Sequence, residues 1–175
     1  MKQIILFASI MLAAGLLFTN MYNSLVDARS WGADIPRSIE TARQYFKVAN
    51  PGDFFRIFSP INQLLALLAL ILFWKTPASV RAYLAIALVL YVLCDVLTFA
   101  YFYPRNDILF KTGSLTDTGI LRSAWSGWNV VNWLRSSMLF VGLVFSFAAL
   151  HKIYSHKHAA AVTEIKQEQT IPELR

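Results

Sequence analysis

The chain has 175 residues, of which 57% are hydrophobic and only 15% are charged. Soluble domains are typically about 45–50% apolar and about 25% charged, so the composition excludes an ordinary soluble domain and indicates an integral membrane protein. The net charge of +6 is spread over loops and the C-terminal segment rather than gathered on one face, which argues against nucleic acid as a partner and fits contact with anionic lipid headgroups.

The first apolar run covers about residues 3–26 and follows Lys2. Its apolar core is longer than the roughly 7–15 residues of a signal-peptide core, and the "FTNMYNS" that follows is a poor cleavage site. We therefore expect an uncleaved first transmembrane helix.

The next connection, about 27–53, is long and contains "IPRSIETARQYFKV". Its pattern predicts a short amphipathic helix over 36–48 that lies at the membrane interface and ends before "ANPGDF". The side chains expected to meet the bundle or lipid are Ile39, Tyr45, Phe46 and Val48. Those expected to reach water or headgroups are Arg37, Arg43 and Lys47.

Three further apolar runs follow, at about 54–74, 80–103 and 128–150. A bilayer core needs about 20 helical residues, and backbone facing lipid must satisfy its own hydrogen bonds, so each run predicts a transmembrane helix. The connections are a tight turn at 75–79 and a polar loop at 104–118.

The predicted fold is thus all-α: an integral-membrane four-helix bundle with a short interfacial helix in the first connection. The transmembrane domain would cover 1–155, and 156–175 would be a polar, mobile tail. Four spans place both termini on one side of the membrane together with residues 75–79. We expect a bacterial inner membrane with both termini cytoplasmic, because Lys75 and Arg81 bracket the shortest loop.

A charge within the fourth run needs an explanation. Arg135 lies about seven residues inside it, where an arginine costs roughly 2.5–3.5 kcal/mol on the insertion scale. Asp95 lies at a similar depth in the third run, roughly 10–12 Å from the end that carries the two long connections. The sequence therefore predicts that Asp95 is the counter-ion of Arg135.

Other polar residues fall at the same depth on each predicted helix. They are Asn20, Asn23 and Asp27; Arg56, Ser59, Asn62 and Gln63; Tyr91, Asp95, Thr98 and Phe102; and Asn129, Asn132, Arg135 and Ser136. The opposite halves are almost entirely apolar. This pattern predicts an apolar plug in one half and a polar, aromatic pocket in the other. The alternative is that these residues only join helices by hydrogen bonds, worth about 0.6 kcal/mol each.

Several chemistries have no support in the sequence. Cys94 is the single cysteine, and His151, His156 and His158 lie away from the polar cluster, so we expect no metal site and no cofactor. Neither a Gly-rich phosphate loop nor a nucleophile elbow is present, which argues against phosphoryl transfer and hydrolysis.

Two segments resemble a known family. "FYPRNDILF" is similar to the Pro-x-Asn-x-x-Leu element that follows the third helix of the anthrone-oxygenase-like family of small four-helix membrane proteins. "WNVVNWLR" is similar to that family's Trp-x-x-x-(His or Asn)-x-x-Arg element on the fourth helix, which maps onto Trp128, Asn132 and Arg135. The long first connection and tight second one also match, so the resemblance covers nearly the whole chain.

The resemblance implies a small apolar or aromatic ligand and, if the chain is an enzyme, an oxygenase that converts a polycyclic anthrone to an anthraquinone without metal or flavin. Asn132 stands where the family often has His and cannot abstract a proton. The base would then be Asp95 or Asp27, while Arg135 with Asn132 would stabilise the developing oxyanion. Trp128 would pack on the ring, and the other residues expected to bind substrate are Asn20, Asn62, Arg56 and Asn106.

The rival hypothesis is a non-enzymatic binding protein or membrane partner subunit whose polar cluster only fixes helix packing. An enclosed cavity of about 300 Å³ or more, lined by these residues, would favour ligand chemistry. A filled, hydrogen-bonded core would favour the rival.

Overall fold

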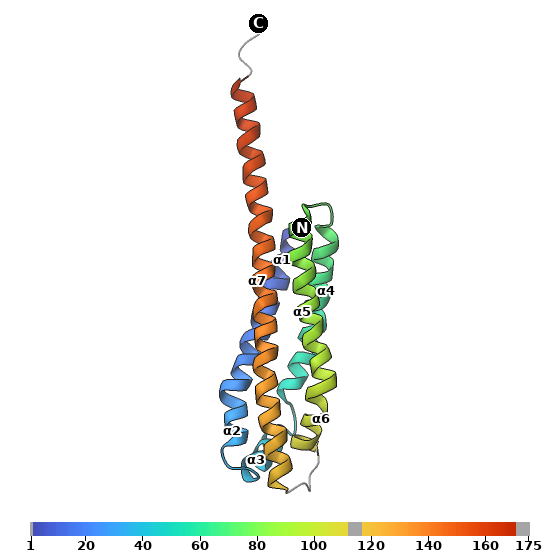
Figure 1. Ribbon diagram of the computed structural model, residues 1–175, viewed down its shortest axis with the longest axis vertical. Coiled ribbons are helices and arrows are strands. Elements are labelled where there is room, and N and C mark those ends of the chain that lie inside the picture. Colours follow the sequence, from blue (N-terminus) through green and yellow to red (C-terminus); the bar gives the residue numbers. More distant parts are fainter. Residues whose placement is uncertain (1, 112–116, 171–175) are drawn as a thin grey trace.

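The computed structural model describes residues 2–111 and 117–170, the second range with its side chains as far as Ser155. Every regular element in these ranges is helical, as an all-α fold requires. Four long helices, side by side in Figure 1, form the body of the molecule: α1 (Lys2–Tyr22), α4 (Pro51–Leu72), α5 (Ala78–Leu97) and α7 (Thr118–Thr170).

The four long helices form a closed ring. Both α1 and α5 pack against α4 and α7, so the order around the bundle is α1, α4, α5, α7. The helical stretches long and apolar enough to cross a membrane are Lys2–Gly32, Pro51–Leu72, Ala78–Lys111 and Thr118–Ser155. They correspond to the four predicted runs, and the predicted membrane four-helix bundle is confirmed.

The two ends of the bundle differ. The N-terminus and the α4–α5 turn lie at one end, called here the terminal end (Figure 1). The other end, called the loop end, carries the short helices α2 (Ala28–Gly32), α3 (Arg37–Tyr45) and α6 (Tyr103–Asn106). This is the arrangement predicted for a four-span chain.

The α7 helix continues past the bundle at the terminal end as far as Thr170 (Figure 1). The proposed division between a transmembrane domain and a polar tail at residue 155 stays a prediction. Residues 171–175 of that tail lie outside the described ranges.

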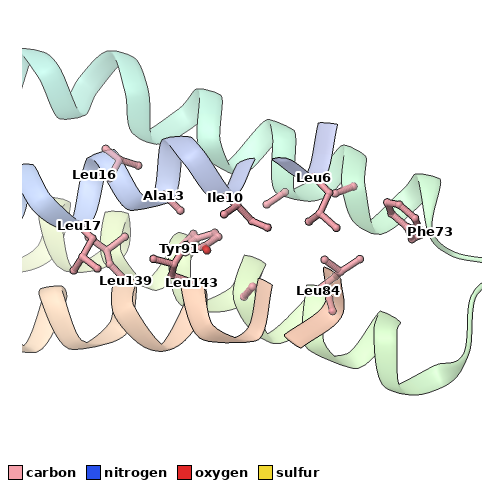
Figure 2. Close-up of a cluster of buried hydrophobic side chains, with 14 of the residues drawn as sticks. Leu6, Ile10, Ala13, Leu16, Leu17, Phe73, Leu84, Tyr91, Leu139 and Leu143 are labelled. Atoms are coloured by element: carbon pink, nitrogen blue, oxygen red, sulfur yellow. The ribbon is translucent and has the colours of Figure 1, made fainter. Parts of the chain in front are cut away.

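Packing in the terminal half of the bundle is apolar, as the sequence predicts. Figure 2 shows Leu6, Ile10 and Leu84 among the side chains that fill it. Tyr91 also lies here rather than at the polar level, and its hydroxyl is 3.1 Å from Ser146 Oγ. No channel through this half is evident among the described residues, since a continuous cluster of buried side chains occupies it.

Three π-helical turns lie toward the loop end: η1 (Asn23–Asp27), η2 (Thr98–Phe102) and η3 (Asp107–Lys111). They extend the first and third spans beyond the predicted limits. The expected polar loop at 104–118 is therefore wrong for residues up to Lys111, which are helical. Pro104 lies in the first turn of α6 directly after the η2 turn, and the helical stretch continues through it to Lys111. Leu109 in η3 is fully buried.

The interfacial segment forms the predicted short helix, α3. Ile39 is fully buried and Phe46 packs against the same cluster, whereas Tyr45 and Val48 are exposed. After α3, "ANPGDF" supplies the N-cap of α4: Asn50 Oδ1 accepts from the Gly52 N–H at 2.8 Å, and Asp53 accepts from the Asn50 N–H at 3.0 Å. Two backbone N–H groups at the start of this helix thereby have hydrogen-bond partners.

The expectation that Arg43 reaches water is wrong. Its side chain is only 11% exposed and its Nε donates to the Leu109 carbonyl at 2.8 Å. Arg43 Nη1 also meets Glu40 at 3.1 Å, so the residue joins α3 to η3. Hydrogen bonds from Gln44 and Arg43 hold the pKa of the exposed Glu40 carboxyl below its usual range.

Candidate functional site

A cavity of about 750 Å³ lies in the loop-end half of the bundle. It is within the range of small-molecule sites and larger than the roughly 300 Å³ expected of a ligand pocket. Every span and every π turn contributes to its wall; the lining includes Asn23, Phe55, Arg56, Asp95, Thr98, Phe102, Phe110, Trp128 and Arg135.

Aromatic rings form one side of the cavity. Trp31 makes edge-to-face contacts with Trp128 and Phe110, with ring centroids 5.1 and 5.0 Å apart. Trp128 contacts Phe102 in the same way at 5.5 Å, and its Nε1 donates to Asn106 Oδ1 at 2.9 Å. The interlocked rings leave a stiff, largely apolar wall suited to a flat ligand.

Arg135 lies at the inner part of the cavity and is only 6% exposed. Its Nη2 donates to Asn132 Oδ1 at 2.8 Å and to Asn20 Oδ1, and its Nη1 donates to Thr98 Oγ1 at 3.2 Å. The guanidinium also lies over the rings of Phe102 and Phe55, with Cζ 4.3 and 4.9 Å from the centroids. Its Nε is buried without a hydrogen-bond partner.

The predicted pairing of Arg135 with Asp95 is wrong. No ion pair within 4.0 Å joins them among the described residues, because each is held by other groups. Ser59 Oγ donates to Asp95 Oδ1 and Gln63 Nε2 donates to Asp95 Oδ2, both at 2.6 Å. Ser59 and Gln63 are one helical turn apart on α4, so that helix supplies both donors. A carboxylate and a cation thus line one cavity without contacting each other.

The amides of Asn20 and Asn132 form a reciprocal clamp between α1 and α7. Asn20 Nδ2 donates to the Asn132 carbonyl at 3.2 Å, and Asn132 Nδ2 donates to the Asn20 carbonyl at 3.1 Å. Each amide also meets a serine, Ser136 at 2.7 Å and Ser24 at 2.6 Å. Both Oδ1 atoms thus remain directed at Arg135 and fix its position.

Five of the nine predicted site residues line the cavity: Asp95, Arg135, Arg56, Trp128 and Asn106. Asn20 and Asn132 are buried and touch it only through Arg135. Asn62 accepts a hydrogen bond from Ser9 at 3.3 Å on the α1 side of α4, and neither it nor Asp27 lines the cavity. The structure therefore brings five candidates to the cavity wall, keeps Asn20 and Asn132 in contact with Arg135, and leaves Asn62 and Asp27 away from it.

Sequence reasoning missed several residues of the cavity wall. Phe46 belongs to the predicted interfacial helix, Phe55 to the second predicted span and Phe110 to the predicted loop, and ring character alone did not separate them from lipid-facing aromatics. Lys47 was expected to reach water or headgroups and Lys111 lay in the predicted polar loop, although both line the cavity. A helical repeat that allowed for the extra residue in each π turn would have placed Phe110 and Lys111 on the cavity side of the helix.

No group of three or more His, Cys, Asp or Glu side chains that could hold a metal ion occurs within residues 2–111 and 117–155. The polar groups that line the cavity are amides, hydroxyls, cations and the carboxylates of Asp95 and Asp107.

A family model described as anthrone oxygenase matches residues 54–145, which include most of α4, all of α5, the η2 and η3 turns and the cavity-lining part of α7. No curated protein and no solved structure matches the chain significantly.

Proposed function

Because the chain belongs to the anthrone oxygenase family, we propose that its cavity binds a small aromatic molecule and oxidises an activated methylene of that molecule with dioxygen. One observation carries the proposal. Asp95 and Arg135 line the same cavity, and neighbouring amides and hydroxyls keep them from neutralising each other.

The two charges suit two parts of the reaction. Asp95 would take a proton from a C–H bond that is acidified by a conjugated carbonyl, and the electron pair would move to that carbonyl oxygen. Arg135 would stabilise the resulting oxyanion with its free Nε edge. Trp128 and Phe102 would hold the ring plane between these groups.

The oxidation balances with dioxygen as the only other reactant. The carbanion forms a C–O bond to dioxygen, and the proton on Asp95 returns to give a hydroperoxide. Loss of the remaining C–H proton with cleavage of the O–O bond leaves a carbonyl and water. One oxygen atom enters the product and the other leaves as water.

Asn132 has a positioning role in this scheme. Its Oδ1 accepts from Arg135 Nη2 at 2.8 Å and its Nδ2 donates to α1, so it aims the guanidinium rather than transferring a proton. Because Asn132 cannot act as a base, the proposed base is Asp95, whose carboxylate lines the cavity beside Arg135.

The test is turnover of 1,8-dihydroxyanthrone by the purified chain in lipid nanodiscs, followed by quinone absorbance and oxygen uptake against empty discs. Asp95→Asn should lower the rate about 10²-fold or more, the usual contribution of a general base. Asp34→Asn is the matched control, because Asp34 is exposed at the same end and does not line the cavity. A wild-type rate equal to that of empty discs would refute the oxygenase.

The second candidate is a non-enzymatic ligand-binding or partner subunit. Its support is that Asn20, Asn132 and Asn62 are hydrogen-bonded to other helices and do not line the cavity. On this hypothesis the same discs would bind the anthrone without turning it over, or would bind nothing while the polar substitutions still reduced stability. We further propose that the bundle lies in a bacterial inner membrane with both termini cytoplasmic.

A further inference from the structure

We infer that the opening of the cavity is a second anion subsite, so that the ligand is an aromatic molecule carrying an ionised acid group. The inference rests on the proposed role of the cavity as a ligand site, and it specifies what that ligand must carry. The subsite consists of the outer cations Lys47, Arg56 and Lys111, which line the cavity and are exposed.

The charges on the cavity wall are arranged by depth. Arg135 is the buried cation, whereas the side chains of Arg56 and Lys111 are 67% and 77% exposed. The cavity wall therefore has cations at its inner part and at its opening, together with the carboxylates of Asp95 and Asp107 and aromatic rings of η2, η3 and α7. Asp95 is hydrogen-bonded to Ser59 and Gln63, and Asp107 is paired with Lys111. A ligand that fills it must be apolar in its body and able to accept hydrogen bonds at both ends.

The outer cations are weakly engaged within the chain. Arg56 meets Asp53 at 3.2 Å and Lys111 meets Asp107 at 2.9 Å, both as neighbours on one exposed helical turn. Such exposed pairs contribute little to stability. Lys47 has no acidic partner within the described part of the chain. These three side chains can therefore turn toward a ligand anion at little cost.

Position separates the outer cations from basic residues that only face headgroups. Arg29 and Arg37 are also exposed at the loop end, yet neither lines the cavity. Lys47, Arg56 and Lys111 come from three different segments and share one wall. Lipid headgroups would need only a basic face, whereas an acid on an aromatic body needs cations at the opening of an aromatic cavity.

The buried guanidinium supplies the independent sign of a ligand. Arg135 Nε is an unpartnered donor on a side chain more than nine-tenths buried, and that side chain lines the cavity. A buried donor without a partner is costly unless an acceptor occupies the site for part of the time. The inner end of the ligand therefore carries an oxygen, and the acid group lies at the outer cations.

The experiment compares anthracene-9-carboxylate with neutral 9-anthracenemethanol, using energy transfer from the cavity tryptophans in nanodiscs of neutral phosphatidylcholine. The wild type should bind the acid about tenfold more tightly than the alcohol, and Lys47→Gln/Lys111→Gln should reduce this preference to about twofold. Arg29→Gln/Arg37→Gln removes the same charge from the same end and should keep the tenfold preference. High salt should weaken binding of the acid and leave binding of the alcohol unchanged.

Three outcomes would overturn the inference. The first is an equal loss of preference in both double variants. The second is decanoate competing as well as the aromatic acid. The third is a variant Lys47→Gln/Lys111→Gln that still prefers the acid over the alcohol as the wild type does, but retains less anionic phosphatidylglycerol. That result would assign the outer cations to lipid. Anthrone turnover is a separate readout: its absence would remove the proposed chemistry and leave an acid preference standing.

Discussion

Arg135 is stabilised inside the membrane by neutral groups. Moving an arginine to the bilayer centre costs roughly 2.5–3.5 kcal/mol on the insertion scale. A hydrogen bond to a charged group contributes about 1.5–3 kcal/mol, and a desolvated cation–π contact about 2 kcal/mol. Three hydrogen-bond acceptors and two aromatic faces contact this guanidinium, so a carboxylate partner is not needed. The positive charge thus remains available to the cavity.

Arg135→Leu should lower the free energy of unfolding by about 2–4 kcal/mol, because it leaves the Asn20 and Asn132 oxygens buried without their donor. Combining it with Asp95→Asn should show a coupling energy below about 1 kcal/mol, since the two residues share no hydrogen-bond partner. Thermal unfolding in detergent measures both quantities.

The control for this comparison of single and double variants is Arg29→Leu. Because Arg29 is exposed, the change should alter the free energy of unfolding by less than about 0.5 kcal/mol. A coupling of about 3–5 kcal/mol would instead indicate a direct buried ion pair.

Depth along the helices was enough to predict that Asp95 and Arg135 lie at one level, and both line the cavity. Their partners could not be predicted in the same way. Any carboxylate, amide or hydroxyl at the right depth can accept from an arginine, and the choice depends on rotamers and helix rotation that a residue count does not contain. Gln63 and Thr98 were recognised as polar neighbours, but not as the groups that separate the charges.

At the scale of elements, the π turns determine which side chains reach the cavity. Each adds about one residue to a turn, which rotates every following side chain relative to a 3.6-residue repeat. Asp27 shares a predicted face with Asn23, which lines the cavity, yet Asp27 is the last residue of the η1 turn and lies off the cavity. The four long helices are set by hydrophobic length and could be predicted, whereas the π turns have no comparable sequence signal.

Arg43 joins α3 to the η3 turn, so Arg43→Gln should loosen the loop end. Losing the donors to the Leu109 and Ile108 carbonyls should speed amide exchange in 107–111 about tenfold, which corresponds to roughly one net charged hydrogen bond. Hydrogen exchange followed by mass spectrometry measures this.

Arg37→Gln on the same helix should leave exchange in 107–111 unchanged, because Arg37 is exposed. Equal protection in wild type and Arg43→Gln would show that the buried Leu109 side chain alone holds η3 in place.

The whole molecule is divided across its length. The terminal half is filled by apolar side chains (Figure 2), and the loop-end half holds the cavity. The α7 helix is about 80 Å long at 1.5 Å per residue, against about 40–45 Å for a bilayer with its headgroups. Its C-terminal part therefore extends beyond the membrane on the side away from the cavity.

Cysteine labelling in sealed vesicles should reflect this division. Residues introduced as Lys75→Cys and Arg37→Cys lie at opposite ends and should react with an impermeant maleimide from opposite faces of the membrane. Native Cys94 is buried and should stay unlabelled. Labelling of both positions from one face would contradict the four-span topology.

The cavity and the packed apolar half lie at opposite ends of the bundle, so access to the cavity differs between the two faces of the membrane. Buried apolar side chains fill the terminal half, so we expect substrate and product to use the same opening at the loop end. An aromatic substrate made on the terminal-end side of the membrane would have to cross the bilayer before it could enter the cavity. Its product would then be released at the loop-end side. Chemistry in this bundle would therefore belong to one surface of the membrane and could not move its ligand across it.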